Sequence, residues 1–240
     1  MRLLPAWLPA LSLLAIAGLA LPVPALAQAY QCSLPRQIDR PRPAKPDGPV
    51  RRVPIGSYTL AASWSPEYCK IKGDKTSMQC SGRSGRFGFV LHGLWPEAQS
   101  GPPPQWCAVT PRPSAKVLRG NLCMSPSPWL LEHEWAKHGS CMTGQPETYF
   151  KVSAILWQSL RWPDADDLSR KKDLTAGDLR RAFIQLNPDW KANHIGIETS
   201  RTGWLRGIHL CYGRDFLPRT CPRRHYGPAD TARLKIWRGL

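Results

Sequence analysis

Residues 87–97 read FGFVLHGLWPE, and this stretch decides the fold. Phe87, Phe89 and Leu91 alternate with other residues, which is the period of a β-strand with one face in a hydrophobic core. His92 then points to the opposite face. The segment therefore predicts a strand that carries a histidine on the side away from the phenylalanines.

Three further strands are expected before and after this segment. Residues 58–64 alternate apolar with small or polar side chains, and short apolar runs return at 195–197 and 205–212. Strands at both ends with helices between them are typical of an α+β domain with an antiparallel sheet. The segment 101–128 is rich in proline and glycine and is expected to be a long irregular loop.

Three helices are expected between the strands. Two cover about residues 129–137 and 146–157. The third begins at Thr175, which forms a capping-box pattern with Asp178, and it ends before Pro188. The sequence thus predicts several helices packed against the sheet.

Residues 1–27 are typical of a secretory signal peptide. Arg2 precedes an apolar run over residues 3–21, and the A-x-A pattern at 25–27 predicts cleavage before Gln28. A membrane anchor is the alternative, but four prolines interrupt this region and no basic stop-transfer cluster follows at once. We therefore expect a periplasmic or secreted protein.

The rest of the chain divides into an arm and a folded domain. Residues 28–54 are polar and proline-rich, which predicts an extended arm without a core of its own. Cys32 in this arm predicts a disulfide to the body of the protein. The folded domain is expected over residues 55–240.

All eight cysteines follow the predicted leader. An even number in an exported chain predicts four disulfides, and spacing favours only the local pairs Cys69–Cys80 and Cys211–Cys221. A zinc site is the alternative, but no two cysteines lie within four residues of each other. The formal net charge of +16 favours polyanionic partners such as nucleic acid or an anionic membrane surface.

Two short segments concentrate the side chains that could do chemistry. LHGLWPE contains His92, and HEWAKHGSC begins at His133. On a helix, Glu134 and His138 lie four residues apart and share a face, and His133 and Lys137 form another such pair. One helical turn can therefore present an imidazole, a carboxylate and an ammonium to one small volume.

These groups suffice to cleave RNA, which carries its own nucleophile in the 2′-hydroxyl. One imidazole can accept the 2′-proton and another can protonate the leaving 5′-oxygen, because the ordinary pKa of histidine is about 6.5. An ammonium can stabilise the charge that develops on phosphorus. The reaction requires no metal ion or other cofactor.

Three other interpretations are less favoured. The pattern HExxxH places His133 and His138 about 140° apart around a helix, unlike the HExxH of zinc proteases. Ser140 lies beside His138 but lacks the G-x-S-x-G elbow of a serine hydrolase. The third interpretation is a structural role for the histidines in the core. We apply it to the three isolated ones, His194, His209 and His225.

The two segments resemble the active-site signatures of the ribonuclease T2 family. SWSPEYC at 63–69 also resembles that family's early strand, and IHLCY at 208–212 resembles its late strand. The likeness covers roughly residues 55–225, and the leader with its four-disulfide count is similar to the bacterial periplasmic ribonuclease I branch. The resemblance implies an α+β fold, an antiparallel sheet packed with several helices and stapled by disulfides.

The resemblance also implies a role for each residue of the second signature and for His92. His92 matches the general acid that protonates the leaving oxygen, and His138 matches the general base on the 2′-hydroxyl. Glu134 and Lys137 match the pair that stabilises the pentacovalent phosphate. His133 matches a histidine that helps to bind phosphate.

Two further residues match base-binding positions of the family. Trp95 matches an aromatic position beside the 5′-side base, where stacking tolerates any base. Glu97 stands where the family often has an acidic residue. The longer glutamate in place of aspartate leaves the base preference open.

The resemblance pairs Cys107 with Cys141 and leaves Cys32 for Cys123. It implies that residues 55–240 form a catalytic domain with the activity of an endoribonuclease. This enzyme is expected to cleave single-stranded RNA with low base specificity through a 2′,3′-cyclic phosphate. We expect it to be a monomer. We expect no metal, no cofactor and no membrane contact once the leader is removed. The alternative is a catalytically silent basic protein that binds RNA or a surface on the same scaffold.

Overall fold

A four-stranded antiparallel sheet forms the centre of the computed structural model, which describes residues 29–72, 74–108 and 110–238. The strand order is β4-β2-β6-β5, and a separate pair joins β1 to β3. The strands are β1 (Ala29–Cys32), β2 (Ile55–Trp64), β3 (Gly85–Phe87), β4 (Phe89–Ala98), β5 (Ile195–Thr199) and β6 (Leu205–Tyr212). The predicted signal peptide, residues 1–27, and its cleavage site lie outside the described residues.

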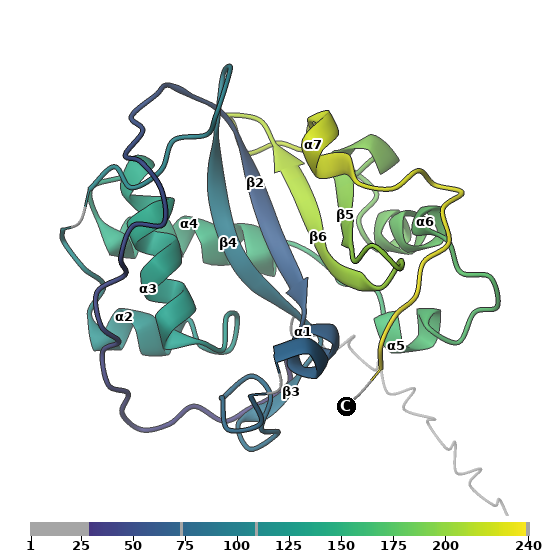
Figure 1. The fold of residues 1–240 in the computed structure, drawn as a ribbon, viewed down its shortest axis with the longest axis horizontal. Coiled ribbons are helices and arrows are strands. Elements are labelled where there is room, and N and C mark those ends of the chain that lie inside the picture. The colour runs from purple at the N-terminus through teal and green to yellow at the C-terminus, as the bar shows by residue number, and fades with distance from the viewer. Residues whose placement is uncertain (1–28, 73, 109, 239–240) are drawn as a thin grey trace, which may run out of the picture.

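Helices lie toward both edges of the sheet, with α2, α3 and α4 toward the edge strand β4 and with α5 and α6 toward the edge strand β5 (Figure 1). The helices are α1 (Ser65–Lys72), α2 (Ala115–Gly120), α3 (Pro128–Lys137), α4 (Pro146–Gln158), α5 (Ala165–Leu168), α6 (Ala176–Leu186) and α7 (Arg223–Tyr226), with 3-10 turns η1 (Gly139–Cys141) and η2 (Ala192–His194). This arrangement confirms the predicted α+β fold. Each helix of the described residues is too short or too polar to cross a bilayer.

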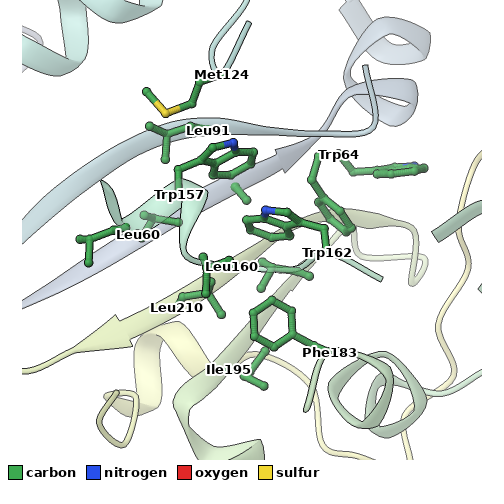
Figure 2. Close-up of a cluster of buried hydrophobic side chains, with 14 of the residues drawn as sticks. Leu60, Trp64, Leu91, Met124, Trp157, Leu160, Trp162, Phe183, Ile195 and Leu210 are labelled. Carbon is green, nitrogen blue, oxygen red and sulfur yellow. The ribbon is translucent and has the colours of Figure 1, made fainter. Parts of the chain in front are cut away.

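The hydrophobic core lies on one face of the sheet. Leu60 of β2, Leu91 of β4 and Leu210 of β6 are buried there. Figure 2 shows them together with Trp157 of α4 and Phe183 of α6. Because this face is covered by the helical layer, polar side chains of the strands gather on the opposite face.

The predicted strand around His92 is interrupted at Gly88. Phe87 pairs with Ala29 of β1, whereas Phe89 begins β4 and pairs with β2. The alternation of Phe87, Phe89 and Leu91 therefore spans two strands of different sheets. Periodicity alone could not reveal this break, because Phe87 at the end of β3 and Phe89 and Leu91 at the start of β4 are all buried.

Two other segments differ from the sequence expectation. The segment 63–69 resembles a strand, but β2 ends at Trp64 and helix α1 follows, because Pro66 suits the first turn of a helix and not a central strand. The predicted loop 101–128 contains the short helix α2, whose first turn is capped by the hydroxyl of Ser114.

Four disulfides join the cysteines in the expected pairs, Cys32–Cys123, Cys69–Cys80, Cys107–Cys141 and Cys211–Cys221. The first of them attaches the proline-rich arm to the chain after α2. From there the arm runs along the outer side of α2 and α3 before it enters β2 (Figure 1). The arm thus contacts the part of the protein that carries HEWAKHGSC.

Candidate active site

A β-bulge in β4 changes which of its residues face the core. Ala61 of β2 pairs with Gly93 and Ala62 pairs with Leu91, so His92 is an extra residue between the two pairs. Bulges of this kind bend a strand and turn a side chain toward a new direction, often at active sites.

The residues after the bulge take the opposite alternation. Leu91 and Leu94 both enter the core although they lie three positions apart, which an unbroken strand does not allow. As a result His92, Trp95 and Glu97 all lie on the face away from the core. Without the extra residue, Trp95 and Glu97 would point to the face opposite His92.

Helix α3 lies beside β4 and presents two buried sides (Figure 1). The hydroxyl of Ser127 accepts a hydrogen bond from the N–H of Leu130 and caps the helix at its start. Leu131 and Trp135 pack into the core. Glu134, on the next side of the helix, is also buried and faces β4.

The carboxyl group of Glu134 fills the space that a side chain at position 93 would need. A Cβ atom added at Gly93 would lie 2.0 Å from Glu134 Oε2. The indole N–H of Trp95 donates a hydrogen bond of 2.7 Å to the same oxygen. Burial raises the pKa of Glu134 to about 8, although this hydrogen bond and the nearby Lys137 oppose the rise.

His92 and His138 lie against the same carboxyl group. Nε2 of His92 is 3.5 Å from Oε1 of Glu134, and Nε2 of His138 is 4.0 Å from its Oε2. Both imidazoles also pack near the indole of Trp95, with ring centroids 5.5 and 5.6 Å away. The fold therefore brings the two histidines from separate segments into one small region.

The surroundings of the two imidazoles favour their neutral forms. The hydroxyl of Ser63 lies 3.0 Å from Nδ1 of His92 and orients that ring toward Glu134. Burial lowers the pKa of His138 to about 3 and lowers the pKa of His92 as well, and the positive charge of Lys137 acts in the same direction on both. Burial therefore favours the uncharged forms of both imidazoles and the protonated form of Glu134.

His133 and Lys137 lie on a third side of α3, next to the arm. The ring of His133 stacks on Trp129 with the ring planes 21° apart and meets the indole of Trp106 edge-on. Nζ of Lys137 lies 2.7 Å from Oδ2 of Asp47 in the arm. Burial and the nearby ammonium lower the pKa of His133.

Glu97 is buried near the end of β4, and protein side chains hold both of its oxygens. The hydroxyl of Thr59 donates to Oε1 at 3.0 Å, and Nε2 of His225 lies 2.8 Å from the same atom. Arg224 forms an ion pair with Oε2. Two residues of α7 are therefore attached to the site face of the sheet.

His209 lies beside this cluster, where sequence reasoning had not placed it. Its ring centroid is 5.5 Å from that of Trp95 and 5.2 Å from that of His225. A structural role was expected for His209 and His225; both lie on the site face of the sheet, where His225 contacts Glu97 and His209 packs against the rings of Trp95 and His225. The position of His209 could have been found from the alternation over 205–212, which puts His209 on the face opposite its two apolar neighbours. His194 does take a structural role, since its Nδ1 accepts the N–H of Lys191.

The arrangement can hold one anionic group against two imidazoles, with the ammonium of Lys137 on the neighbouring side of the same helix. Each imidazole can accept or donate a proton when its pKa changes on ligand binding. Among the described residues, no three His, Cys, Asp or Glu side chains are grouped so that they could hold a metal ion. These groups fit acid–base chemistry at an anionic centre.

Comparisons with known proteins agree with this arrangement. Residues 55–178 match the model of the Ribonuclease T2 family. A protein of Haemophilus influenzae named "Probable ribonuclease" is 28% identical over 187 residues, which cover 72% of this chain and 64% of that protein. A protein of Aeromonas hydrophila named "Ribonuclease" is 38% identical over 163 residues, which cover 66% of this chain and 72% of that protein.

The fold is also similar to solved structures. The structure of trichomaglin, described as an S-like ribonuclease, superposes with a TM-score of 0.61 at 19% sequence identity. The match covers 77% of this chain and 98% of trichomaglin. At this level of identity the likeness concerns the fold.

We expect Gly93→Ala to damage both stability and activity, because the new methyl group would collide with the Glu134 carboxyl group. Overpacking of this kind destabilises by about 1–3 kcal/mol. Thermal denaturation and RNA cleavage measure the two effects. Gly120→Ala is the matched control, since a Cβ there meets nothing within 4 Å. Equal behaviour of the two variants would contradict the close approach of α3 to β4.

We expect Glu134→Gln to stabilise the protein at alkaline pH. The pKa of Glu134 is raised from its ordinary value of 4.5 to about 8, so wild-type stability falls as pH rises through this window. The amide keeps an acceptor for Trp95 and has no charge to bury. At pH 8 the gain should be roughly 2 kcal/mol, or about 5 °C in Tm, and it should shrink toward pH 5. A variant that melts below wild type at pH 8 would show that Glu134 is not a buried acid.

Proposed function

The chain belongs to the ribonuclease T2 family, and we propose that it is an endoribonuclease that cleaves single-stranded RNA through a 2′,3′-cyclic phosphate. The observation that carries the proposal is the pair of imidazoles, His92 and His138, that lie against one carboxyl group. Transphosphorylation needs one base and one acid on the two sides of a phosphodiester, and this pair can supply both.

The two histidines take different roles in the proposed reaction. His138 is neutral in the free protein and accepts the proton of the 2′-hydroxyl as this oxygen attacks phosphorus. His92 must be protonated to release the 5′-oxygen, and the negative phosphodiester favours this because a nearby anion raises the pKa of an imidazole. The bond between phosphorus and the 5′-oxygen then breaks as the proton reaches that oxygen.

The remaining groups stabilise the charge and the geometry. The ammonium of Lys137 supplies a positive charge for the oxygens of the pentacovalent phosphate, and His133 on the same side of α3 binds a phosphate oxygen. Glu134 orients the two catalytic imidazoles. Water then opens the cyclic phosphate in a slower second step with the acid and base roles reversed.

The surroundings of His92 offer room for the leaving nucleoside. A hollow of about 270 Å³ adjoins this histidine and is lined in part by Ser63, Tyr68, Lys72 and Arg206. Because His92 protonates the leaving oxygen, we place the nucleoside that carries this oxygen in the hollow. The exposed ring of Tyr68 offers a surface for stacking, which accepts any base.

Low base specificity is supported by the contacts of Glu97 and Trp95. Both oxygens of Glu97 are held by protein side chains, and the indole N–H of Trp95 is bonded to Glu134. Of these two residues, Trp95 offers its ring to a base on the 5′ side. Stacking on a ring distinguishes bases less sharply than hydrogen bonds do.

We also propose that the protein works as a monomer in the periplasm or outside the cell. Four disulfides form in an oxidising compartment, and residues 1–27 have the pattern of a cleaved leader. Once the leader is removed, we expect no membrane contact. The residues proposed for the reaction need no metal ion or cofactor, so activity should survive a chelator.

The decisive experiment is end-group analysis of the product from an RNA dinucleotide. We expect a 2′,3′-cyclic phosphate, with or without EDTA, and no cleavage of the matching deoxydinucleotide. His92→Phe and His138→Phe should each lower kcat by about 10²–10⁴-fold while RNA still binds, because each removes one proton-transfer group. His194→Phe is the control and should keep its activity. Binding of RNA by the wild type without cleavage would instead favour the catalytically silent protein.

The pH dependence of kcat/KM tests which of the two histidines carries a proton when the reaction begins. Burial lowers the pKa of His138 to about 3 and lowers the pKa of His92 from 6.5, and the reaction needs His92 protonated and His138 neutral in the free enzyme. We therefore expect kcat/KM for a dinucleotide to peak below pH 6.5 and to fall as His92 loses its proton. A maximum at or above pH 7 would contradict the assigned acid.

A further inference from the structure

A carboxylate from the N-terminal arm binds the side chain of Lys137. Oδ2 of Asp47 lies 2.7 Å from Nζ of Lys137, and Oδ1 of Asp47 accepts a hydrogen bond of 3.0 Å from the indole N–H of Trp106. The Lys137 ammonium holds the pKa of Asp47 below its ordinary value, although partial burial opposes this. The carboxylate form of Asp47 is therefore favoured at neutral pH.

Trp106 holds Lys137 in a second way. Its backbone N–H donates a hydrogen bond of 2.8 Å to the backbone oxygen of Lys137. The residue is 2% exposed and has a φ of 56°, in the left-handed region that a bulky side chain rarely adopts. Strained backbone of this kind persists only where surrounding contacts enforce it, and it is concentrated at functional sites. One buried tryptophan thus fixes both the main chain of Lys137 and the carboxylate that binds its side chain.

The arm itself is anchored on both sides of Asp47. After it, Arg51 and Gln105 exchange two backbone hydrogen bonds, of 2.9 and 3.1 Å. The side chain of Gln105 also donates to the carbonyl of Pro49 at 2.8 Å. Before it, Arg112 donates to the carbonyl of Pro41 at 2.7 Å. The carboxylate is therefore presented by a fixed main chain and not by a loose tail.

We propose that Asp47 is a positioning residue that holds the Lys137 ammonium where charge develops on phosphorus. This inference rests on the proposed function, in which Lys137 stabilises the pentacovalent phosphate. A lysine side chain has a flexible four-carbon stem, and an ammonium that is ordered before the reaction stabilises the transition state without reorganisation. The ammonium has three N–H groups, so the bond to Asp47 leaves two for phosphate oxygens.

The same contact could act against the reaction if the carboxylate competed with the substrate phosphate for Lys137. The two roles differ in their kinetic signature. A competitor raises KM and leaves kcat unchanged, so its removal would improve substrate binding. A positioning carboxylate acts in the transition state, so its removal lowers kcat with little change in KM. The anchoring by Trp106 and Gln105 favours positioning, because a competitor must leave when RNA binds.

The test is the substitution Asp47→Asn, measured by dinucleotide cleavage over a range of substrate concentrations that reaches saturation. We expect kcat to fall about tenfold, as for the loss of one charge-assisted hydrogen bond at a partly exposed site, with KM changed less than about threefold. Asp39→Asn is the matched control, because it removes the same charge from an exposed position of the same arm. Trp106→Phe, which removes the indole N–H that fixes Asp47, should lower kcat in the same direction.

A double-mutant cycle separates the inference from the proposed function. In a Lys137→Ala background, Asp47→Asn should change kcat less than about twofold, because the group that it positions is gone. Thermal denaturation verifies that each variant is folded. An equal loss of kcat with and without Lys137, an unchanged kcat, or a lower KM at unchanged kcat would overturn the role of Asp47 alone. Full kcat in Lys137→Ala itself would overturn the proposed role of Lys137 and the inference with it.

Discussion

The site depends on one buried contact between the helical layer and the sheet, the carboxyl group of Glu134 against Gly93. The bulge at His92 and the absence of a side chain at position 93 make room for it. Trp95 donates to it, and the two imidazoles lie against it. Burial disfavours the charged form of Glu134 and raises its pKa. The same buried carboxyl group is what the two histidines share.

Helix α3 connects the three parts of the molecule that meet at the site. One side places Trp135 in the core, a second places Glu134 and His138 against the sheet, and a third places His133 and Lys137 against the arm. Because three sides of this ten-residue helix are packed against other parts of the protein, few of its positions face only water. This explains why the segment HEWAKHGSC combines charged, aromatic and imidazole side chains at neighbouring positions.

Much of this could be predicted from local sequence patterns. The spacing of Glu134 and His138 predicted a shared helical face, and the capping box at Thr175 predicted the start of α6. The bulge at His92 could not be predicted from alternation, because alternation assumes one residue for each partner on the neighbouring strand, and a glycine within the strand was the only local sign. The alternation over 205–212 put His209 on the face away from the core, but it does not indicate which side chains of other strands lie beside a lone histidine. The contact of Asp47 was invisible for a related reason, since an irregular arm has no period that relates it to a helix.

The arm's contacts also determine the order in which the molecule can be completed. Cys32 and Cys123 are 91 residues apart, and Asp47 and Lys137 are 90 residues apart. Ribosomes make chains from the N-terminus, so the arm emerges before any of its partners exist. It can dock only after α3 and the chain before it have been synthesised and folded. The arm is thus made before α3 but reaches its place only after it, and the ammonium of Lys137 has no carboxylate partner from the arm until then.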